Sequence, residues 1–262
     1  LTVLEADEST RYLVLEMGAS GPGHIAYLTD IAPLDAAGVL MIGHAHMGGF
    51  GSIEGVAAAK AEIIAGLRPE GIAILNADDA RAAAMAELAP ARVLTFSARG
   101  RQADLRAENV DLDAAARAAF DLHLPGLAEP RRVQLAVAGV HNVSNALAAA
   151  GLALAAGLAP ELVADRLGSV SIESPHRMDI SELSGDLLLI DDSYNANIDS
   201  MTAALAVLPA LAGDRRRVVV ISEMLELGES SAADHARTGE LAARAGAAML
   251  IGIGSTQEAL EA

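Results

Sequence analysis

The chain has 262 residues, of which 52% are hydrophobic, and a formal net charge of −17. This length allows one large domain or two ordinary domains with a substantial core. The acidic balance and the scarcity of aromatic residues argue against nucleic acid as a partner, and the charge also disfavours an anionic membrane. Because the chain has no cysteine, disulfides and thiolate metal sites are excluded.

No apolar run in the chain is long enough to span a membrane. The first residues also lack the basic start and the apolar core of a signal peptide. We therefore expect a cytoplasmic protein without membrane insertion.

In the first hundred residues, apolar runs typical of buried strands alternate with segments typical of helices. The expected strands are 12–15, 36–43, 71–75 and 92–96, and the expected helices are 24–31, one that Ser52 caps, and 79–89. This alternation predicts an α/β fold, with a mostly parallel sheet and helices on both faces.

The pattern changes after residue 100. Residues 121–125 and 132–137 are expected to pair as antiparallel strands at the edge of the sheet, and an Ala-rich helix follows from Asn142 to about Gly157. A smaller Rossmann-like unit is then expected, with strands at 187–190, 217–221 and 248–253 and helices from about 199 and 232. We therefore expect a central domain at 1–173 and a C-terminal domain at 174–262.

Lys60 is the only lysine in the chain and lies on the apolar stripe of its helix, with Ile53, Val56 and Ile63. One interpretation is that its stem packs while its ammonium group reaches water. The other is that burial lowers its pKa, so that the amine takes up carbon dioxide and becomes a carbamate. Carbamate oxygens would suit a hard divalent cation. The position of Lys60 leaves both interpretations open.

Three further side chains could join Lys60. Glu16 ends the expected strand 12–15, where open α/β sheets place ligand groups, although it could equally be a solvated loop residue. His44 and His46 follow the strand 36–43 and could complete a metal site.

Polar residues also gather at two other expected element ends. Asn142 and Asn145 share one helical face, where their amides could contact a base or ribose, although we expect one of them to cap the helix. The segment 191–197 places several polar residues directly after the strand 187–190.

Taken together, the chain resembles the Mur ligases of peptidoglycan synthesis. Seven stretches carry the resemblance in family order: LEMGASGPGHIAYLT at 15–29, IGHAHMGGFGSIEGVAAAKAEI at 42–63, ILNADD at 74–79, GVHNVSNALAAA at 139–150, HRMD at 176–179, IDDSYNANIDSM at 190–201 and EMLELGE at 223–229.

The resemblance implies an ATP-dependent ligase that activates a carboxylate as an acyl phosphate, with ATP and Mg²⁺ as cofactors. Its implied substrates are a UDP-linked muramoyl tripeptide and D-alanyl-D-alanine, and the full-length protein is expected to be a monomer. The implied metal ligands are Glu16, His46 and carbamylated Lys60, of which Lys60 and His46 are also catalytic. The implied nucleotide contacts are Asn142, Asn145, Arg177, Asp192, Asn195 and Asn197.

The chain also departs from the family pattern. A G-x-x-x-x-G-K-[ST] phosphate loop requires a lysine, and Lys60 does not lie in such a loop. Met41, His44, Gly48 and the pair 222–223 also replace residues that are usual in the family. We interpret the chain as a fragment of a full ligase that lacks the N-terminal domain and this loop.

Three other interpretations remain open. The first alternative is a non-catalytic homologue that has lost the loop and kept a binding or regulatory role. The second is a metal-dependent hydrolase that uses Glu16, His44 and His46. The third is a sister ligase of the same family that uses a different amino acid or glutamate.

Overall fold

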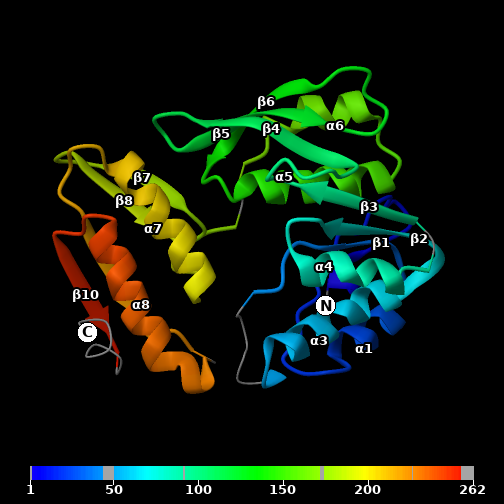
Figure 1. Cartoon of the computed structure of the whole chain (residues 1–262), viewed down its shortest axis with the longest axis horizontal. Coiled ribbons are helices and arrows are strands. Elements are labelled where there is room, and N and C mark those ends of the chain that lie inside the picture. The colour runs from blue at the N-terminus through cyan, green and yellow to red at the C-terminus, as the bar shows by residue number, and fades with distance from the viewer. Residues whose placement is uncertain (1, 44–49, 91, 172–173, 226, 255–262) are drawn as a thin grey trace.

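The computed structural model describes residues 2–43, 50–90, 92–171, 174–225 and 227–254. Its elements form two units that lie side by side (Figure 1). The first unit is defined here as the described residues up to 171, and the second unit as those from 174 onward. None of the described helices is both long and apolar enough to cross a membrane.

The described part of the first unit contains a six-stranded sheet in the order β1-β2-β3-β4-β5-β6. Strands β1 to β4 are parallel to one another, whereas β4, β5 and β6 pair antiparallel. The expected mostly parallel sheet and its antiparallel edge are therefore confirmed. The strands are β1 (Leu34–Val39), β2 (Leu67–Asn76), β3 (Arg92–Ser97), β4 (Leu105–Leu112), β5 (Arg117–His123) and β6 (Arg131–Ala138).

Helices cover both faces of this sheet (Figure 1). Helix α3, with α1 packed against it, and α4 lie on one face, while α5 and α6 lie on the other. Their bounds are α1 (His24–Ile31), α3 (Ile53–Ala65), α4 (Ala80–Ala84), α5 (Asn142–Ala155) and α6 (Pro160–Leu167), with short 3₁₀ turns η1 (Thr2–Glu5) and η2 (Met85–Leu88).

Strand β2 shows why both faces of the sheet are apolar. Ala73 and Leu75 pack in the cluster that includes α3, whereas Ile74 packs in the cluster that includes α5. Successive strand residues point to opposite faces, and helices cover both faces here. All three side chains are therefore fully buried. A parallel strand covered on both faces needs such a continuous apolar run.

The expected strand at 12–15 is wrong. Residues 11–19 form neither a helix nor a strand, and Tyr12 and Val14 are exposed. Apolar composition favours a strand, but a strand also needs a neighbour that completes its hydrogen bonds. Among the described residues, no strand pairs with this segment. Several boundaries also differ: β1 runs from Leu34 to Val39 rather than over 36–43, and β2 begins at Leu67 rather than at residue 71. Strand β4 was not expected.

The second unit begins with an antiparallel hairpin of β7 (Asp179–Leu183) and β8 (Leu187–Asp191). Strand β9 (Val218–Ser222) pairs in parallel with β10 (Met249–Ile253), and α7 (Ile198–Ala212) and α8 (Ser231–Arg244) pack on one face of this pair. A 3₁₀ turn, η3 (Gly228–Ser230), precedes α8. Strand β7 was not expected. The strands and helices that were expected in this unit are present.

A small apolar cluster joins the two units. Ala116 and Ala138 of the first unit are buried against Val207 of α7, and Met178 and Leu211 pack around them. This contact places the start of β5 and the end of β6 against the second unit.

Candidate active site

The connection after β1 is held against the carboxyl end of β2. The Asn76 side chain donates from Nδ2 to the carbonyl oxygen of Leu40 at 2.7 Å, and the backbone N–H of Ile42 donates to Asp79 Oδ2 at 2.7 Å. Asp79 also caps α4, as its Oδ1 accepts from the N–H of Arg81 at 2.9 Å, so the expected cap is confirmed. The carboxyl ends of parallel strands thus converge where ligands bind in open α/β sheets.

Lys60 lies half-buried on α3, as its place on the apolar stripe predicted. Burial lowers the pKa of Lys60, while the negative charge of Glu16 acts in the opposite direction. A lowered pKa raises the fraction of neutral amine, which is the form that attacks carbon dioxide. The structure therefore places Glu16 and Lys60 within electrostatic reach of each other.

Glu62 connects α3 to the start of α1. Its Oε1 accepts from the N–H of Gly23 at 2.7 Å and its Oε2 from the N–H of Ala26 at 3.0 Å. Backbone N–H groups at a helix N-terminus have no partner within the helix, and a carboxylate is favourable there. Glu62 therefore anchors, beside α3, the segment that follows Glu16.

The donors around Lys60 are compatible with magnesium. Magnesium prefers oxygen ligands, which Glu16 supplies and which Lys60 would supply once carbamylated. His46, the third expected ligand, lies outside the described residues, as does His44. Within the described ranges, no group of three His, Cys, Asp or Glu side chains is placed to hold a metal ion.

The two asparagines at the start of α5 are brought together. Asn145 Nδ2 donates to Asn142 Oδ1 at 3.0 Å, and Asn142 Nδ2 donates to the carbonyl oxygen of Ala138 at 2.7 Å. His141 is the N-cap residue and makes no side-chain capping bond. The expectation that one asparagine caps the helix is therefore wrong, because Asn142 instead ties α5 to the end of β6.

His141 of the first unit lies within electrostatic reach of Asp192 of the second. Burial raises the pKa of Asp192, and its Oδ1 accepts from the N–H of Met178 at 2.9 Å. The charges of His141 and Arg177 favour the ionised carboxylate. Desolvation lowers the pKa of His141, and Asp192 opposes this effect. Asp192, His141 and Arg177 therefore form one electrostatic group across the two units.

The segments around Asp192 are ordered by polar contacts. The Arg177 guanidinium lies 4.2 Å from the centre of the Tyr194 ring, in cation–π geometry. His176 Nδ1 lies 2.7 Å from Asp191 Oδ2. Hydrogen bonds from Ser193 and then His176 lower the pKa of Asp191 to about 2.

Asn197 and Asn195 interact mainly with the nearby backbone. Asn197 Oδ1 caps α7, accepting from the N–H groups of Asp199 and Ser200 at 3.0 and 2.9 Å. Asn195 Oδ1 accepts from the N–H of Ala196 at 2.8 Å. Among the described residues, the side-chain Nδ2 of neither asparagine donates a hydrogen bond.

One cross-unit contact was not anticipated from the sequence. A Cβ placed on Gly43 would lie 2.7 Å from Asp199 Oδ2, so the first turn of α7 reaches the connection after β1. An acidic residue in the first turn of a helix was the available signal, but it also fits simple stabilisation of the helix N-terminus.

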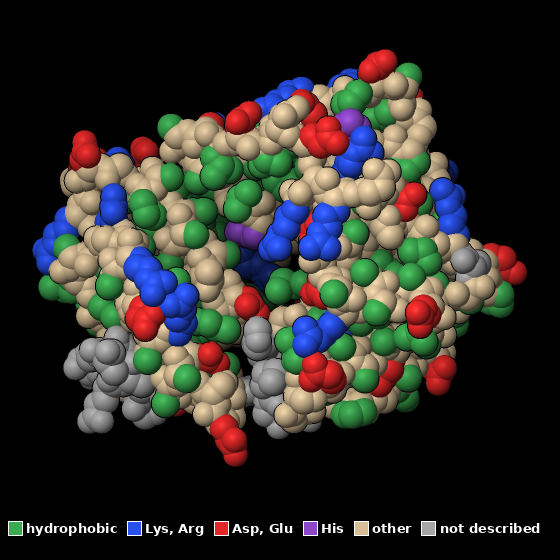
Figure 2. All heavy atoms as spheres, viewed as in Figure 1, with side chains coloured by type: hydrophobic (Ala, Val, Ile, Leu, Met, Phe, Trp, Pro, Cys, Tyr) green, Lys and Arg blue, Asp and Glu red, His purple; other side chains and the backbone are tan. Residues whose placement is uncertain are grey.

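Gly43 approaches Asp199, and the charges of His141 and Asp192 act on each other, so residues of both units face the same region. Figure 2 shows this face hollowed there, with a histidine and basic side chains in the hollow. Such an arrangement can bind an anionic ligand and, when the units close on it, keep water away from a reacting group.

Two family models match the chain. The Mur ligase middle domain matches residues 1–153, and the glutamate ligase domain of Mur ligases matches residues 176–262. A UDP-N-acetylmuramoyl-tripeptide–D-alanyl-D-alanine ligase from Mycobacterium bovis is 43% identical over 258 residues, which cover 97% of this chain and 50% of that protein.

Solved structures show the same similarity. MurF from Acinetobacter baumannii superposes with a TM-score of 0.89 at 34% identity, covering 99% of this chain and 55% of its own. MurF from Thermotoga maritima, in complex with ADP, has a TM-score of 0.73 at 27% identity, covering 87% and 51%. The chain therefore spans about half the length of the relatives that it matches.

Proposed function

Because the chain belongs to the Mur ligase family, we propose that it acts in an ATP-dependent amide ligase that adds D-alanyl-D-alanine to UDP-N-acetylmuramoyl-tripeptide. The observation that carries this proposal is the 43% identity to a ligase of that name over 97% of the chain. In the proposed reaction, a carboxylate oxygen of the tripeptide attacks the γ-phosphorus of ATP and ADP leaves. The dipeptide amine then attacks the acyl carbon, loses a proton and expels phosphate.

In this proposal, residues 1–173 form the ATP-binding central domain and residues 174–262 the C-terminal ligase domain. The nucleotide lies between them, in contact with Asn142, Asn145, Arg177, Asp192, Asn195 and Asn197. The ADP complex of the T. maritima relative and the grouping of His141, Arg177 and Asp192 across the units support this assignment. Arginine suits phosphate because its guanidinium group donates two parallel hydrogen bonds.

The proposed metal is Mg²⁺, held by Glu16, His46 and carbamylated Lys60. When bound, it would neutralise charge on the transferring phosphoryl group. Lys60 and His46 are the proposed catalytic residues. The lowered pKa of Lys60 and the nearby Glu16 carboxylate support this assignment.

The remaining assignments follow from the proposed substrates. Because the proposed substrates are ATP and a UDP-linked precursor, we propose a cytoplasmic reaction and a monomer for the complete ligase. Closure of the second unit over the first would shield the acyl phosphate from water.

A lysine substitution tests the proposal. In a ligase that includes this chain, Lys60→Ala should abolish tripeptide-dependent ADP release, and added formate should restore part of it by replacing the carbamate. Lys60→Arg is the matched control, because it keeps the positive charge but cannot form the carbamate, and it should be equally inactive. Full activity of Lys60→Ala would refute the assignment.

A second candidate is a non-catalytic homologue with a binding role. It is favoured by the position of the only lysine, which excludes a G-x-x-x-x-G-K-[ST] loop from these 262 residues. We expect the 262-residue chain alone to bind nucleotide weakly and to form no ADP. ADP release by this chain alone would exclude the second candidate.

A further inference from the structure

A buried histidine holds the connection that follows β9. Strand β9 pairs in parallel with β10, and after the last paired residues the N–H of Glu223 donates to the carbonyl oxygen of Ile253 at 3.1 Å. The next backbone N–H, that of Met224, donates instead to His235 Nε2 on α8 at 3.0 Å. Since a buried backbone N–H needs an acceptor, the His235 ring supplies one where the pairing with β10 ends.

The two hydrogen bonds of His235 determine where its proton lies. A backbone N–H can only donate, so Nε2 must be unprotonated in order to accept from Met224. A carbonyl oxygen can only accept, so Nδ1, which lies 2.7 Å from the carbonyl oxygen of Ser231, must carry the proton. The His235 ring is therefore neutral, and its single proton is on Nδ1.

Protonation of His235 is incompatible with the bond to Met224. A proton that binds the ring takes the lone pair of Nε2, which already accepts from Met224. The two N–H groups would then face each other, and because both residues are buried, neither N–H would have water as an acceptor. Imidazole ordinarily titrates between about pH 8 and about pH 5. This backbone hydrogen bond is therefore one that mild acid can break.

The connection after β9 lies at a functionally placed end of the second unit. Met224 and Leu227 anchor it, because both side chains are buried. Helices α7 and α8 begin at this same end (Figure 1). A Cβ on Gly43 of the first unit would lie close to Asp199 in the first turn of α7. Loss of the bond to His235 would therefore loosen the end of the second unit that approaches the first.

No charged side chain takes part in the two short hydrogen bonds of the ring, because both partners are backbone groups. Asp234 accepts from the Ser230 hydroxyl at 2.7 Å, and Arg237 donates to Glu240 at 2.6 Å. Strands β9 and β10 contain no charged residue. The charged residues near His235 on α8 and on the other segments around it are Asp199 of α7, Glu223 after β9, Glu229 of η3, and Asp234 and Arg237 of α8.

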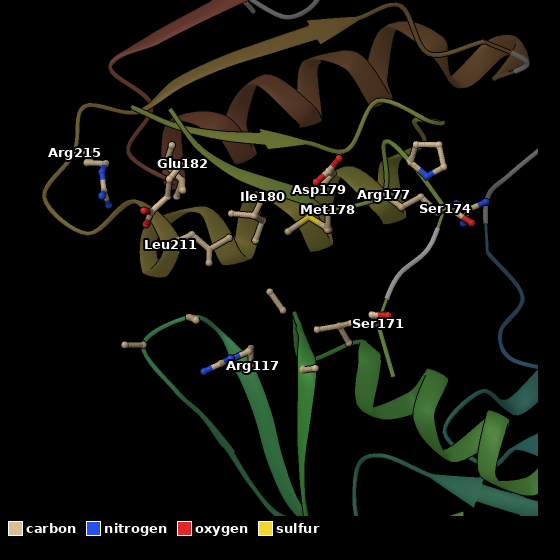
Figure 3. Close-up of a pocket in the computed structure, with 17 residues that line it drawn as sticks. Arg117, Ser171, Ser174, Arg177, Met178, Asp179, Ile180, Glu182, Leu211 and Arg215 are labelled. Atoms are coloured by element: carbon tan, nitrogen blue, oxygen red, sulfur yellow. The ribbon is translucent and has the colours of Figure 1, made fainter. Parts of the chain in front are cut away.

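A cavity between the two units offers no comparable group. Its volume is about 630 Å³, and it is lined by parts of β5, β6, β7 and α7 (Figure 3). Arg117 and Arg215 lie on opposite walls, and each binds an aspartate of its own unit, Asp113 and Asp186 respectively. None of the described residues that line the cavity is a histidine. The contacts around this cavity therefore do not depend on the protonation of an imidazole.

We propose that His235 is a pH-sensitive switch in the second unit. In its neutral form it holds the connection after β9 through the N–H of Met224. In acid, one proton from solvent binds to Nε2, the hydrogen bond from Met224 is lost, and the connection is released.

Hydrogen exchange of the Met224 amide tests the switch on the 262-residue chain. Its protection factor, which is corrected for the intrinsic pH dependence of exchange, should fall about tenfold between about pH 7.5 and about pH 5.5. This factor is expected because an imidazole released from its hydrogen bond titrates near pH 6.5. His235→Gln can still accept from Met224 through Oε1 but cannot titrate, so its protection factor should stay constant over this interval.

His176→Asn is the matched control. It removes the only other histidine of residues 174–262, and its amide can still donate to Asp191, which the His176 ring contacts. Asparagine also tolerates the positive φ of 62° at this position. In this variant the Met224 protection factor should fall with pH as it does in the unsubstituted chain.

Nitrogen NMR of the unsubstituted chain keeps the proposal testable even when His235→Gln does not fold. At about pH 7.5, Nδ1 of His235 should be protonated and Nε2 unprotonated. As the pH falls, protonation of Nε2 should coincide with a change in the Met224 amide resonance.

Three results would overturn the proposal. A protonated Nε2 at about pH 7.5 would show that the ring does not accept from Met224. A constant Met224 protection factor in the unsubstituted chain would show that acid does not release the connection. An equal fall in His235→Gln would show that another group responds to the acid. These measurements involve neither ATP nor ligase activity, so their failure would leave the proposed function unaffected.

Discussion

The two units bury their sheets to different extents. In the first unit, helices cover both faces of the sheet, and Phe96, Phe120 and Leu122 are fully buried. In the second unit, α7 and α8 cover one face of the β9–β10 pair. Its other face carries the exposed side chains Val218, Val220, Met249, Ile251 and Ile253.

The two units therefore differ in the interactions that hold them together. The first unit has an apolar core closed on both faces of its sheet, whereas the second has a small apolar core and several hydrogen bonds at the end of β8. Parallel sheets in proteins are normally covered on both faces. The bare face of the second unit is therefore a surface suited to covering by further polypeptide.

The largest effect is expected in the closed core. Phe120→Ala should lower the free energy of unfolding by about 3–5 kcal/mol, because it removes buried apolar surface and leaves a cavity. Urea unfolding followed by circular dichroism measures this change. Tyr27→Ala, at an exposed site, should change the value by less than about 0.5 kcal/mol. Equal effects of the two substitutions would contradict the closed core.

A smaller effect is expected in the core of the second unit. Leu205→Ala should cost about 2–3 kcal/mol, because this small cluster can partly collapse around the lost side chain. If the units unfold separately, Leu205→Ala should shift one urea transition and Phe120→Ala the other. A single transition that both variants shift together would show that the units unfold as one.

The bare face should tolerate a polar residue. Val220 is 58% exposed, so Val220→Ser should change the free energy of unfolding by less than about 0.5 kcal/mol. It should also reduce self-association, measured by light scattering, because it interrupts an apolar patch. Val219→Ser is the matched control, because its side chain is buried on the opposite face, and it should destabilise the unit. A large loss of stability in Val220→Ser would show that this face is covered in solution.

The smallest effect concerns the polar turn after β8. Ser193→Ala should raise the pKa of Asp191 from about 2 toward its ordinary value of 3.8, because the Ser193 hydroxyl is the largest cause of the lowering. A lowered carboxyl pKa stabilises the fold above pH 3.8, and this contribution is lost as the pH falls toward 2. The variant should therefore lose less stability across this interval.

Carbon NMR titration of the Asp191 carboxylate measures this pKa directly. Ser181→Ala, on the neighbouring strand β7, is the control and should leave the value near 2. An unchanged Asp191 pKa in Ser193→Ala would show that His176 and the backbone N–H of residue 193 maintain the lowering.

The sequence by itself determined most of the local structure. Apolar periodicity predicted the parallel sheet and the half-buried position of Lys60, while Ser52 and Asp79 marked helix starts that the structure confirms. These features depend on residues within a few positions of one another, so the order of residue types is sufficient to predict them.

Only the tertiary structure decided which distant residues meet. Residues 12–15 look like a strand, yet they lie exposed because no described strand pairs with them. Asp192 comes within electrostatic reach of His141, and Arg117 and Arg215 line one cavity, across long stretches of chain. Such pairs depend on how the two units pack, and no local pattern in either segment encodes its distant partner.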